Sequence, residues 1–241
     1  MAQLVPALEW TEDALRLRQF MFDFWFDHGR PPTLRDAHEG VGLDRRRIVQ
    51  AYKQLDLGLN VTVDLRTQNC ILLKAPPFAS FPTPVQLFVD DTFHSFIGCA
   101  HEVMGCSNSP QVRGKQLRFE SFCECCLEPI TVTMRDFEFL SIEPESTLIH
   151  VTESPWDWLV TDMISMCDAT NFVIDADHAA RYSRMQSKGG VTMTPHQAKD
   201  YIAFVAQQRL WDYHWPPLSM DPPAILARMT ELGIDIANWQ E

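Results

Sequence analysis

The chain has 241 residues, of which 46% are hydrophobic and 11% aromatic, enough to bury a substantial core in one large domain or two small ones. It carries 20 basic residues against 32 acidic ones, and the net charge of -12 disfavours binding to nucleic acid or anionic lipid. No apolar run reaches the roughly 18 residues that span a bilayer, and the N-terminus has early acids where a secretory leader has basic residues. We therefore expect a cytoplasmic protein with no nucleic-acid or membrane partner. Its oligomeric state stays open.

The first third of the chain predicts a winged-helix-like module. Thr11 is a good N-cap for the first helix, and a Gly-containing turn precedes the third. The Arg45-Arg46-Arg47 triplet would suit DNA recognition, but the acidity of the chain favours a structural scaffold. The expected elements are a helix to about His28, a short helix after Pro32, a helix over residues 44–56, and strands over 60–65 and 69–74.

A proline-rich segment follows this module. Residues 75–84 contain four prolines, a composition typical of a linker. We place a domain boundary near residue 80, so that residues 1–80 form the N-terminal module and residues 81–241 form the core with a helical tail.

The stretch from Val85 to Thr133 holds most of the acids, thiols and imidazoles that could do chemistry. An apolar strand delivers Asp90 and Asp91, which we expect at the start of a helix, where exposed N–H groups favour carboxylates. The stretch then forms a strand that ends at a tight Cys123-Glu124-Cys125-Cys126 turn. We read this stretch as the core of an active site.

Helices and strands alternate through the rest of the chain. Asp175 is a good cap for a helix, and no glycine-rich phosphate loop occurs, so a nucleotide cofactor is not supported. The expected elements are a helix from Ser154 to Cys167, a strand over Asn171–Ile174, a helix over Ala176–Gln186, a strand over Val191–Met193, and helices over His196–Leu210 and Pro223–Leu232. The aromatic run Trp211, Tyr213 and Trp215 is expected to cap the core.

Several segments together resemble one known family. They read LFVDDTF, FCECCLEPITVT, MCDATNFVI, DADHAARYS and KGGVTMTPHQA, in this order. Their pattern and spacing are similar to those of the alkylmercury (organomercurial) lyases. The resemblance implies an α+β fold, with a winged-helix-like module packed on a core of small antiparallel or mixed sheets with flanking helices. It also implies cleavage of a carbon–mercury bond, in which two cysteine thiolates take the metal and an aspartate protonates the leaving carbon.

The resemblance also implies site residues. The family's aspartate falls on Asp91 and its second cysteine on Cys167, while its first cysteine, three residues before the aspartate, falls on Phe88. A phenylalanine cannot bind mercury, so the two-thiol capture would be incomplete. We expect Asp91 and Cys167 to converge on one pocket as catalytic residues. The pocket residues expected beside them are Phe88, Asp90, Thr92, His94 and Phe172.

A second metal-like feature is the pair Cys123 and Cys126. The family has a structural cysteine at Cys123, and the C-x-x-C spacing suits a metal, but a structural zinc site needs four ligands. We therefore expect no cofactor, and leave zinc or mercury at this pair open. Seven cysteines without the density of a disulfide scaffold are expected to be reduced.

Three functions are compatible with these residues. The first, which we favour, is a divergent lyase, isomerase or cyclase that uses Asp91 as a general acid or base on a small apolar substrate. The second is a true organomercurial lyase in which Cys99, Cys125 or Cys126 replaces the thiol missing at Phe88. The third is a non-catalytic winged-helix regulator that senses metal through its thiols.

Overall fold

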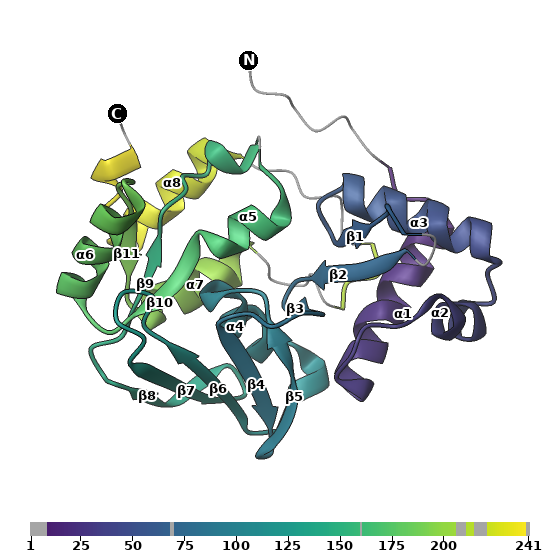
Figure 1. Ribbon diagram of the computed structural model, residues 1–241, viewed down its shortest axis with the longest axis horizontal. Helices are drawn as coiled ribbons and strands as arrows, with labels where there is room; N and C mark the ends of the chain where they lie inside the picture. Colours follow the sequence, from purple (N-terminus) through teal and green to yellow (C-terminus); the bar gives the residue numbers. More distant parts are fainter. Residues whose placement is uncertain (1–8, 68–69, 160, 206–210, 215–220, 240–241) are drawn as a thin grey trace.

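An antiparallel sheet of eight strands connects the two ends of the molecule (Figure 1). The computed structural model describes residues 9–67, 70–159, 161–205, 211–214 and 221–239. The strand order is β1-β2-β3-β5-β4-β6-β7-β8. These strands are β1 Thr62–Asp64, β2 Ile71–Ala75, β3 Phe78–Ala79, β4 Val85–Val89, β5 Thr92–Ile97, β6 Leu117–Phe122, β7 Pro129–Arg135 and β8 Glu138–Glu143.

Three helices form the N-terminal end of the molecule. They are α1 Glu12–His28, α2 Leu34–Val41 and α3 Arg45–Leu57. Thr11, Thr33 and Asp44 accept hydrogen bonds from backbone N–H groups at the three helix starts, as their short polar side chains favour. The predicted order of three helices and two strands is confirmed, and the winged-helix assignment stays a prediction. Arg47, from the basic triplet, forms an ion pair with Asp13 at 2.6 Å.

The proline-rich segment takes part in the sheet. β3 lies inside it and pairs with β2 on one side and β5 on the other. The amide of Gly98, just after β5, also donates to the carbonyl of Pro77 at 2.7 Å. Hydrogen bonds of the sheet therefore run through the segment that we expected to be a linker, while the domain boundary near residue 80 remains a prediction.

The prediction that a helix begins at Asp90 and Asp91 is wrong. Both residues have positive φ, 47° and 65°, and form the two-residue turn between β4 and β5. Mirror-image turns of this kind match the twist of paired strands, and aspartate tolerates positive φ better than most residues. The β-prone run from Thr92 to Ile97 therefore forms a strand.

A second sheet of three antiparallel strands packs with five helices beside the large sheet. Its order is β10-β9-β11, with β9 Leu148–Val151, β10 Thr170–Val173 and β11 Val191–Met193. The helices are α4 Ala100–Ser107, α5 Met163–Asp168, α6 Ala176–Gln186, α7 Pro195–Val205 and α8 Pro222–Glu231, and short 3₁₀ turns cover Pro110–Val112, Asp157–Leu159 and Ala237–Trp239.

Most downstream predictions agree with these elements. The helix predicted over Ala176–Gln186 is confirmed, with Asp175 accepting from His178 N–H as its cap. The helix predicted between Ser154 and Cys167 is shorter, because only a 3₁₀ turn precedes α5. Residues 206–210, the end of another predicted helix, and Trp215 lie outside the described residues. None of the helices within the described part of the chain is long and apolar enough to cross a bilayer.

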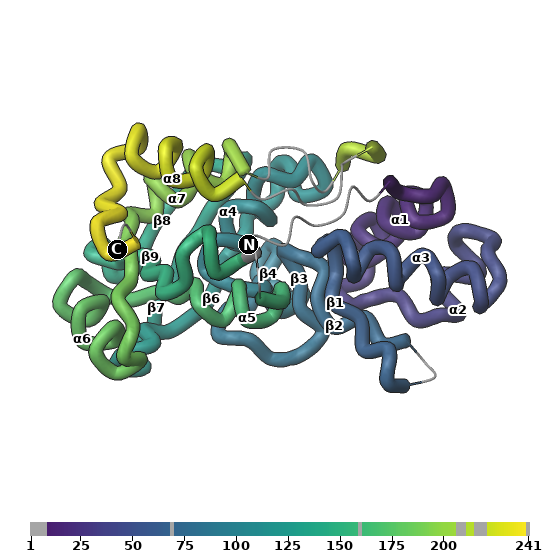
Figure 2. Tube along the Cα trace, turned by 90° about the horizontal axis from the view of Figure 1, so that it is seen from above, coloured from purple at the N-terminus to yellow at the C-terminus, as the bar shows by residue number. Residues whose placement is uncertain are grey.

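The helices α4, α5 and the strand β10 meet beside the large sheet. α4 contacts β10 and α7, and α5 contacts β10 directly. The strand β10 also contacts β6, and Figure 2 shows α5 in the middle of the molecule, between the N-terminal helices and α6. This junction brings together segments that are about 70 residues apart in the sequence.

Candidate functional site

A cavity of about 230 Å³ lies at the junction of the two sheets. Its walls come from the end of β5, the start of α4, the end of α5 and the strand β10, together with the turn after β6. Its lining residues include Gly98, Cys99, Glu124, Cys167, Phe172 and Tyr182.

Cys99 and Cys167 contribute two buried thiols to this cavity. Cys99 is the N-cap residue of α4 and has an extended backbone, with φ −167°. Cys167 lies in the last turn of α5. Both side chains line the cavity and lie close enough for each thiol to shift the pKa of the other, so two sulfur atoms from distant segments come together at the cavity wall.

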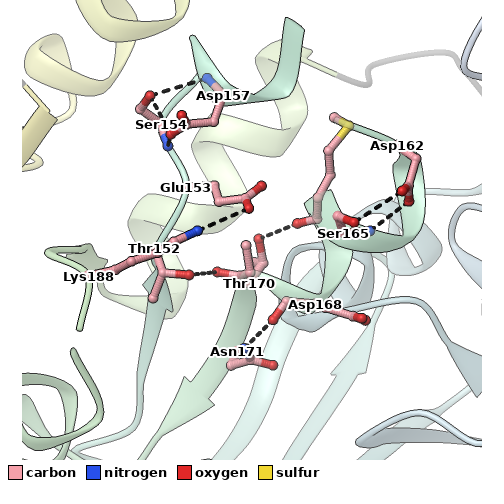
Figure 3. Close-up of polar contacts among 12 residues, drawn as sticks. Thr152, Glu153, Ser154, Asp157, Asp162, Ser165, Asp168, Thr170, Asn171 and Lys188 are labelled. Atoms are coloured by element: carbon pink, nitrogen blue, oxygen red, sulfur yellow. Dashed lines mark hydrogen bonds and ion pairs between the residues drawn. The ribbon is translucent and has the colours of Figure 1, made fainter. Parts of the chain in front are cut away.

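The short helix that carries Cys167 is fixed by polar contacts at both ends (Figure 3). Asp162 caps it by accepting from Ser165 N–H at 2.9 Å. Beyond its end, Asn171 Nδ2 donates to the Asp168 carbonyl at 2.7 Å, and Thr170 Oγ1 donates to Met166 O at 3.3 Å. These bonds hold the turn that carries Cys167 against β10.

The two thiols are electrostatically inequivalent. The interaction with Cys167 and burial raise the pKa of Cys99 well above its usual range. The same interaction lowers the pKa of Cys167, as does the charge of Lys74, against the opposing effect of burial. Cys167 is therefore the thiol that ionises first.

Lys74 supplies the positive charge at this site. It lies on β2 with a fully buried side chain, and its Nζ is 3.9 Å from Asp168 Oδ1. A fully buried lysine almost always has a charged or polar partner. The burial of Lys74 near Cys167 therefore indicates that its positive charge acts on this thiol. Lys74 also ties the N-terminal part of the sheet to the cavity.

Glu102 lies in the first turn of α4, close to the two thiols although it does not line the cavity itself. A methyl group built on Gly98 would lie 3.5 Å from Cys167 Sγ and 3.8 Å from Glu102 Cγ. The charge of Glu102 raises the pKa of both Cys99 and Cys167. One turn further along α4, Gly105 leaves room for the carboxylate, because a Cβ there would lie 3.0 Å from Glu102 Oε2.

The opposite wall of the cavity carries polar groups. Burial raises the pKa of Glu124, and the charge of Asp168 raises it further. Tyr182 OH accepts from Asn171 Nδ2 at 3.3 Å, and burial raises the pKa of Tyr182. Phe172, which we expected in the substrate pocket, lies here with an almost fully buried ring.

Asp91 does not share this cavity with Cys167. Its side chain is 80% exposed at the turn between β4 and β5, where it lies 3.5 Å from Arg118 Nε. The strand β5 separates Asp91 from Gly98, a distance of roughly 20 Å at about 3.3 Å per residue. The expected convergence of Asp91 and Cys167 is therefore absent, because the segment between them is an extended strand.

Four other expected pocket residues also lie away from the cavity. Phe88 packs under the Arg118 guanidinium, 4.2 Å from its ring centre, and Thr92 is exposed at the start of β5. Asp90 accepts from Gln116 N–H at 3.1 Å. The ring of His94 contacts Phe26 O through Nε2 at 2.9 Å, and burial lowers the pKa of His94.

The Cys123 and Cys126 pair lies on the turn between β6 and β7. Glu124, within this turn, lines the cavity, but the cysteines of the turn do not. In the described part of the chain, no group of three or more histidine, cysteine, aspartate or glutamate residues is arranged to hold a metal ion. All seven cysteines are free thiols.

Sequence reasoning did not single out Lys74 or Glu102, whose charges act on the Cys167 thiol. The signal was present: Cys99 stands three residues before Glu102, the spacing that the resembling family has between its first cysteine and its acid. The sequence analysis instead matched Asp91-Thr92 and placed both positions on the preceding hairpin, at Phe88 and Asp91. Lys74 had no comparable signal, because nothing in a strand sequence marks a buried lysine.

Comparisons with known proteins identify the family of the chain. The family model described as MerB, alkylmercury lyase, matches residues 78–206, which is more than half of the chain. No curated protein matches. Among solved structures, the chain is similar to the mercury-bound form of MerB2, with a TM-score of 0.66 and 19% identity over 85% of this chain and 95% of that one. This likeness shows a shared fold. The chain belongs to the alkylmercury lyase family.

Proposed function

We propose that this protein cleaves the carbon–mercury bond of organomercurials, with Cys99 and Cys167 as the mercury ligands and Glu102 as the proton donor. The observation that carries the proposal is that Cys99 and Cys167 line one cavity and interact there, with Glu102 in the first turn of the helix that begins after Cys99. Thiolates are the preferred protein ligands of soft metal ions.

Cys167 makes the first bond to the substrate. Its lowered pKa provides a thiolate, because the Cys99 thiol and then the Lys74 charge stabilise the anion. The thiolate displaces the weak ligand of an R–Hg–X compound and forms R–Hg–S–Cys167, releasing X⁻. The loss of the thiolate charge ends its interaction with the Cys99 thiol, whose proton can then leave.

Glu102 transfers that proton to the leaving carbon. The carboxylate takes the proton from Cys99, and the Cys99 thiolate bonds to the mercury. The Glu102 carboxylic acid then protonates the carbon as the carbon–mercury bond breaks. The sum is R–Hg–S–Cys167 plus Cys99–SH giving R–H and Cys99–S–Hg–S–Cys167, so every proton and bond is accounted for.

This proposal differs from the function that we favoured from the sequence. A metal-free proton transfer at Asp91 needs a desolvated carboxyl group, whereas Asp91 is exposed beside Arg118. The second function considered from the sequence was an organomercurial lyase in which Cys99 could supply the missing thiol. The present proposal keeps Cys99 in that role and replaces Asp91 with Glu102 as the acid. A glutamate reaches one methylene further than an aspartate from the same helix position.

The test is turnover of phenylmercuric acetate in excess external thiol, with benzene measured by gas chromatography. We expect Cys99→Ser and Cys167→Ser to lose nearly all activity. Asp91→Asn is the matched control and should keep wild-type activity, because it changes an exposed acid outside the cavity. Full activity in either serine variant, or loss of activity in Asp91→Asn, would overturn the assignment.

A further inference from the structure

The turn between β6 and β7 concentrates three cysteines within four residues. Cys123 N–H donates to Glu128 O at 2.8 Å, while Cys126 and Leu127 N–H donate back to Cys123 O at 3.3 and 2.8 Å. Leu127 has a positive φ of 66°, which closes the turn tightly. The backbone of the turn is therefore fixed by its own hydrogen bonds.

The backbone of this turn brings Cys123 and Cys126 together, because Cys126 N–H donates to Cys123 O at 3.3 Å. The backbone N–H of Glu128 lowers the pKa of Cys126, but burial and the neighbouring Cys123 and Cys125 thiols outweigh it and raise the pKa overall. Cys126 is partly exposed, so the pair can be reached from solvent, although Cys123 is buried.

We propose that Cys123 and Cys126 form a second thiolate site, for a soft cation that accepts two ligands, such as the mercuric ion. Each thiol loses its proton as it binds, so that Hg²⁺ and two thiols give an S–Hg–S unit and two protons. No oxidation or reduction is involved. The Glu128 N–H group continues to stabilise the bound Cys126 sulfur.

The number of available ligands determines which cations this site can bind. A structural zinc ion needs four ligands in a tetrahedron, whereas the described residues contain no group of three or more suitable side chains. A cation that is satisfied by two thiolates needs only Cys123 and Cys126. Cys126 has a side-chain interaction with Cys123, whereas its interaction with Cys125 is electrostatic.

This site is separate from the proposed catalytic pair. None of its cysteines lines the cavity that contains Cys99 and Cys167, although Glu124 of the same turn does. The Glu124 amide also donates to Phe172 O at 3.1 Å, which fixes the turn to the cavity wall. The proposal uses no residue of the catalytic mechanism, so its failure would leave the proposed lyase activity untouched.

The experiment measures retained mercury in the full-length chain. The Cys99→Ser/Cys167→Ser protein removes the cavity pair, and is mixed with mercuric chloride and passed through gel filtration in a monothiol buffer. We expect one mercury per chain by elemental mass spectrometry. Adding Cys126→Ser should remove it, while the matched control Cys125→Ser, on the same turn, should keep it.

A second measurement avoids any dependence on variant folding. Unsubstituted protein is saturated with mercuric chloride and alkylated with iodoacetamide, and fragment spectra then distinguish adjacent cysteines. We expect Cys126 to be protected and Cys125 to be alkylated. The proposal is overturned if the double variant retains no mercury, if Cys125→Ser abolishes retention as fully as Cys126→Ser, or if Cys126 is alkylated as readily with mercury as without it.

Discussion

Cys99 and Cys167, 68 positions apart in the chain, line one cavity, and their interaction raises the pKa of Cys99 and lowers that of Cys167. One thiol is held protonated while the other is prepared for ionisation. This asymmetry explains how a single site can offer a nucleophile to an incoming organomercurial and still keep the proton that the leaving carbon needs.

The first prediction concerns this interaction itself. In Cys99→Ala the Cys99 thiol is lost, so the pKa of Cys167 should rise. Since a raised pKa leaves less thiolate at neutral pH, the pH profile of Cys167 alkylation, read by peptide mass spectrometry, should move to higher pH. Cys106→Ala, at the far end of α4, is the control and should leave the profile in place. A profile in Cys99→Ala that does not move would show that the two sulfurs are uncoupled.

The second prediction concerns Lys74. Replacing it with methionine removes a buried charge that favours the Cys167 thiolate. The acidic limb of kcat/KM should therefore move to higher pH. Because an apolar side chain replaces a buried ammonium group, the melting temperature should not fall. Lys115→Met, at an exposed lysine, should change neither quantity. An unchanged acidic limb in Lys74→Met would remove Lys74 from the site.

The third prediction uses Gly98 as a probe of the space between the thiol and the acid. The methyl group of Gly98→Ala would meet Cys167 Sγ at 3.5 Å and Glu102 Cγ at 3.8 Å, both ordinary contact distances. The fold should therefore tolerate it, while the substrate loses room. We expect kcat/KM for phenylmercuric acetate to fall, with an unchanged circular dichroism spectrum. Wild-type kcat/KM would place the substrate elsewhere.

Much of the architecture follows from local signals. Asp175 before an amphipathic run predicts the cap and the helix α6, and Thr11 does the same for α1. The hairpin at Asp90 and Asp91 was misread because two aspartates favour both a helix start and a mirror-image turn. The two β-prone runs on either side of these aspartates favour the mirror-image turn over a helix start.

The candidate site is less accessible to sequence reasoning. The meeting of Cys99 with Cys167 depends on how α4 and α5 pack against β10, and no local pattern encodes that contact. The buried charge of Lys74 likewise reflects packing between β2 and the end of α5. The Cys99-x-x-Glu102 spacing was the one local signal, and the match at Asp91-Thr92, eleven residues before Glu102, was preferred to it.

The fourth prediction separates mercury capture from proton transfer. Glu102→Gln preserves shape but cannot donate a proton, so kcat should fall by about 10²–10⁴-fold. Mercury binding to Cys99 and Cys167 should persist, as measured by protection of both thiols from alkylation. Glu102→Asp should recover part of the rate. Equal rates in Glu102→Gln and the wild type would exclude Glu102 as the acid.

The most direct test of the central claim is a single turnover without external thiol. Reduced protein is mixed with less than one equivalent of phenylmercuric acetate; benzene is quantified, and the protected cysteines are identified after alkylation. The account predicts benzene equal to the phenylmercury added, with Cys99 and Cys167 both protected. Release of no benzene, or benzene release with both of these thiols freely alkylated, would contradict it.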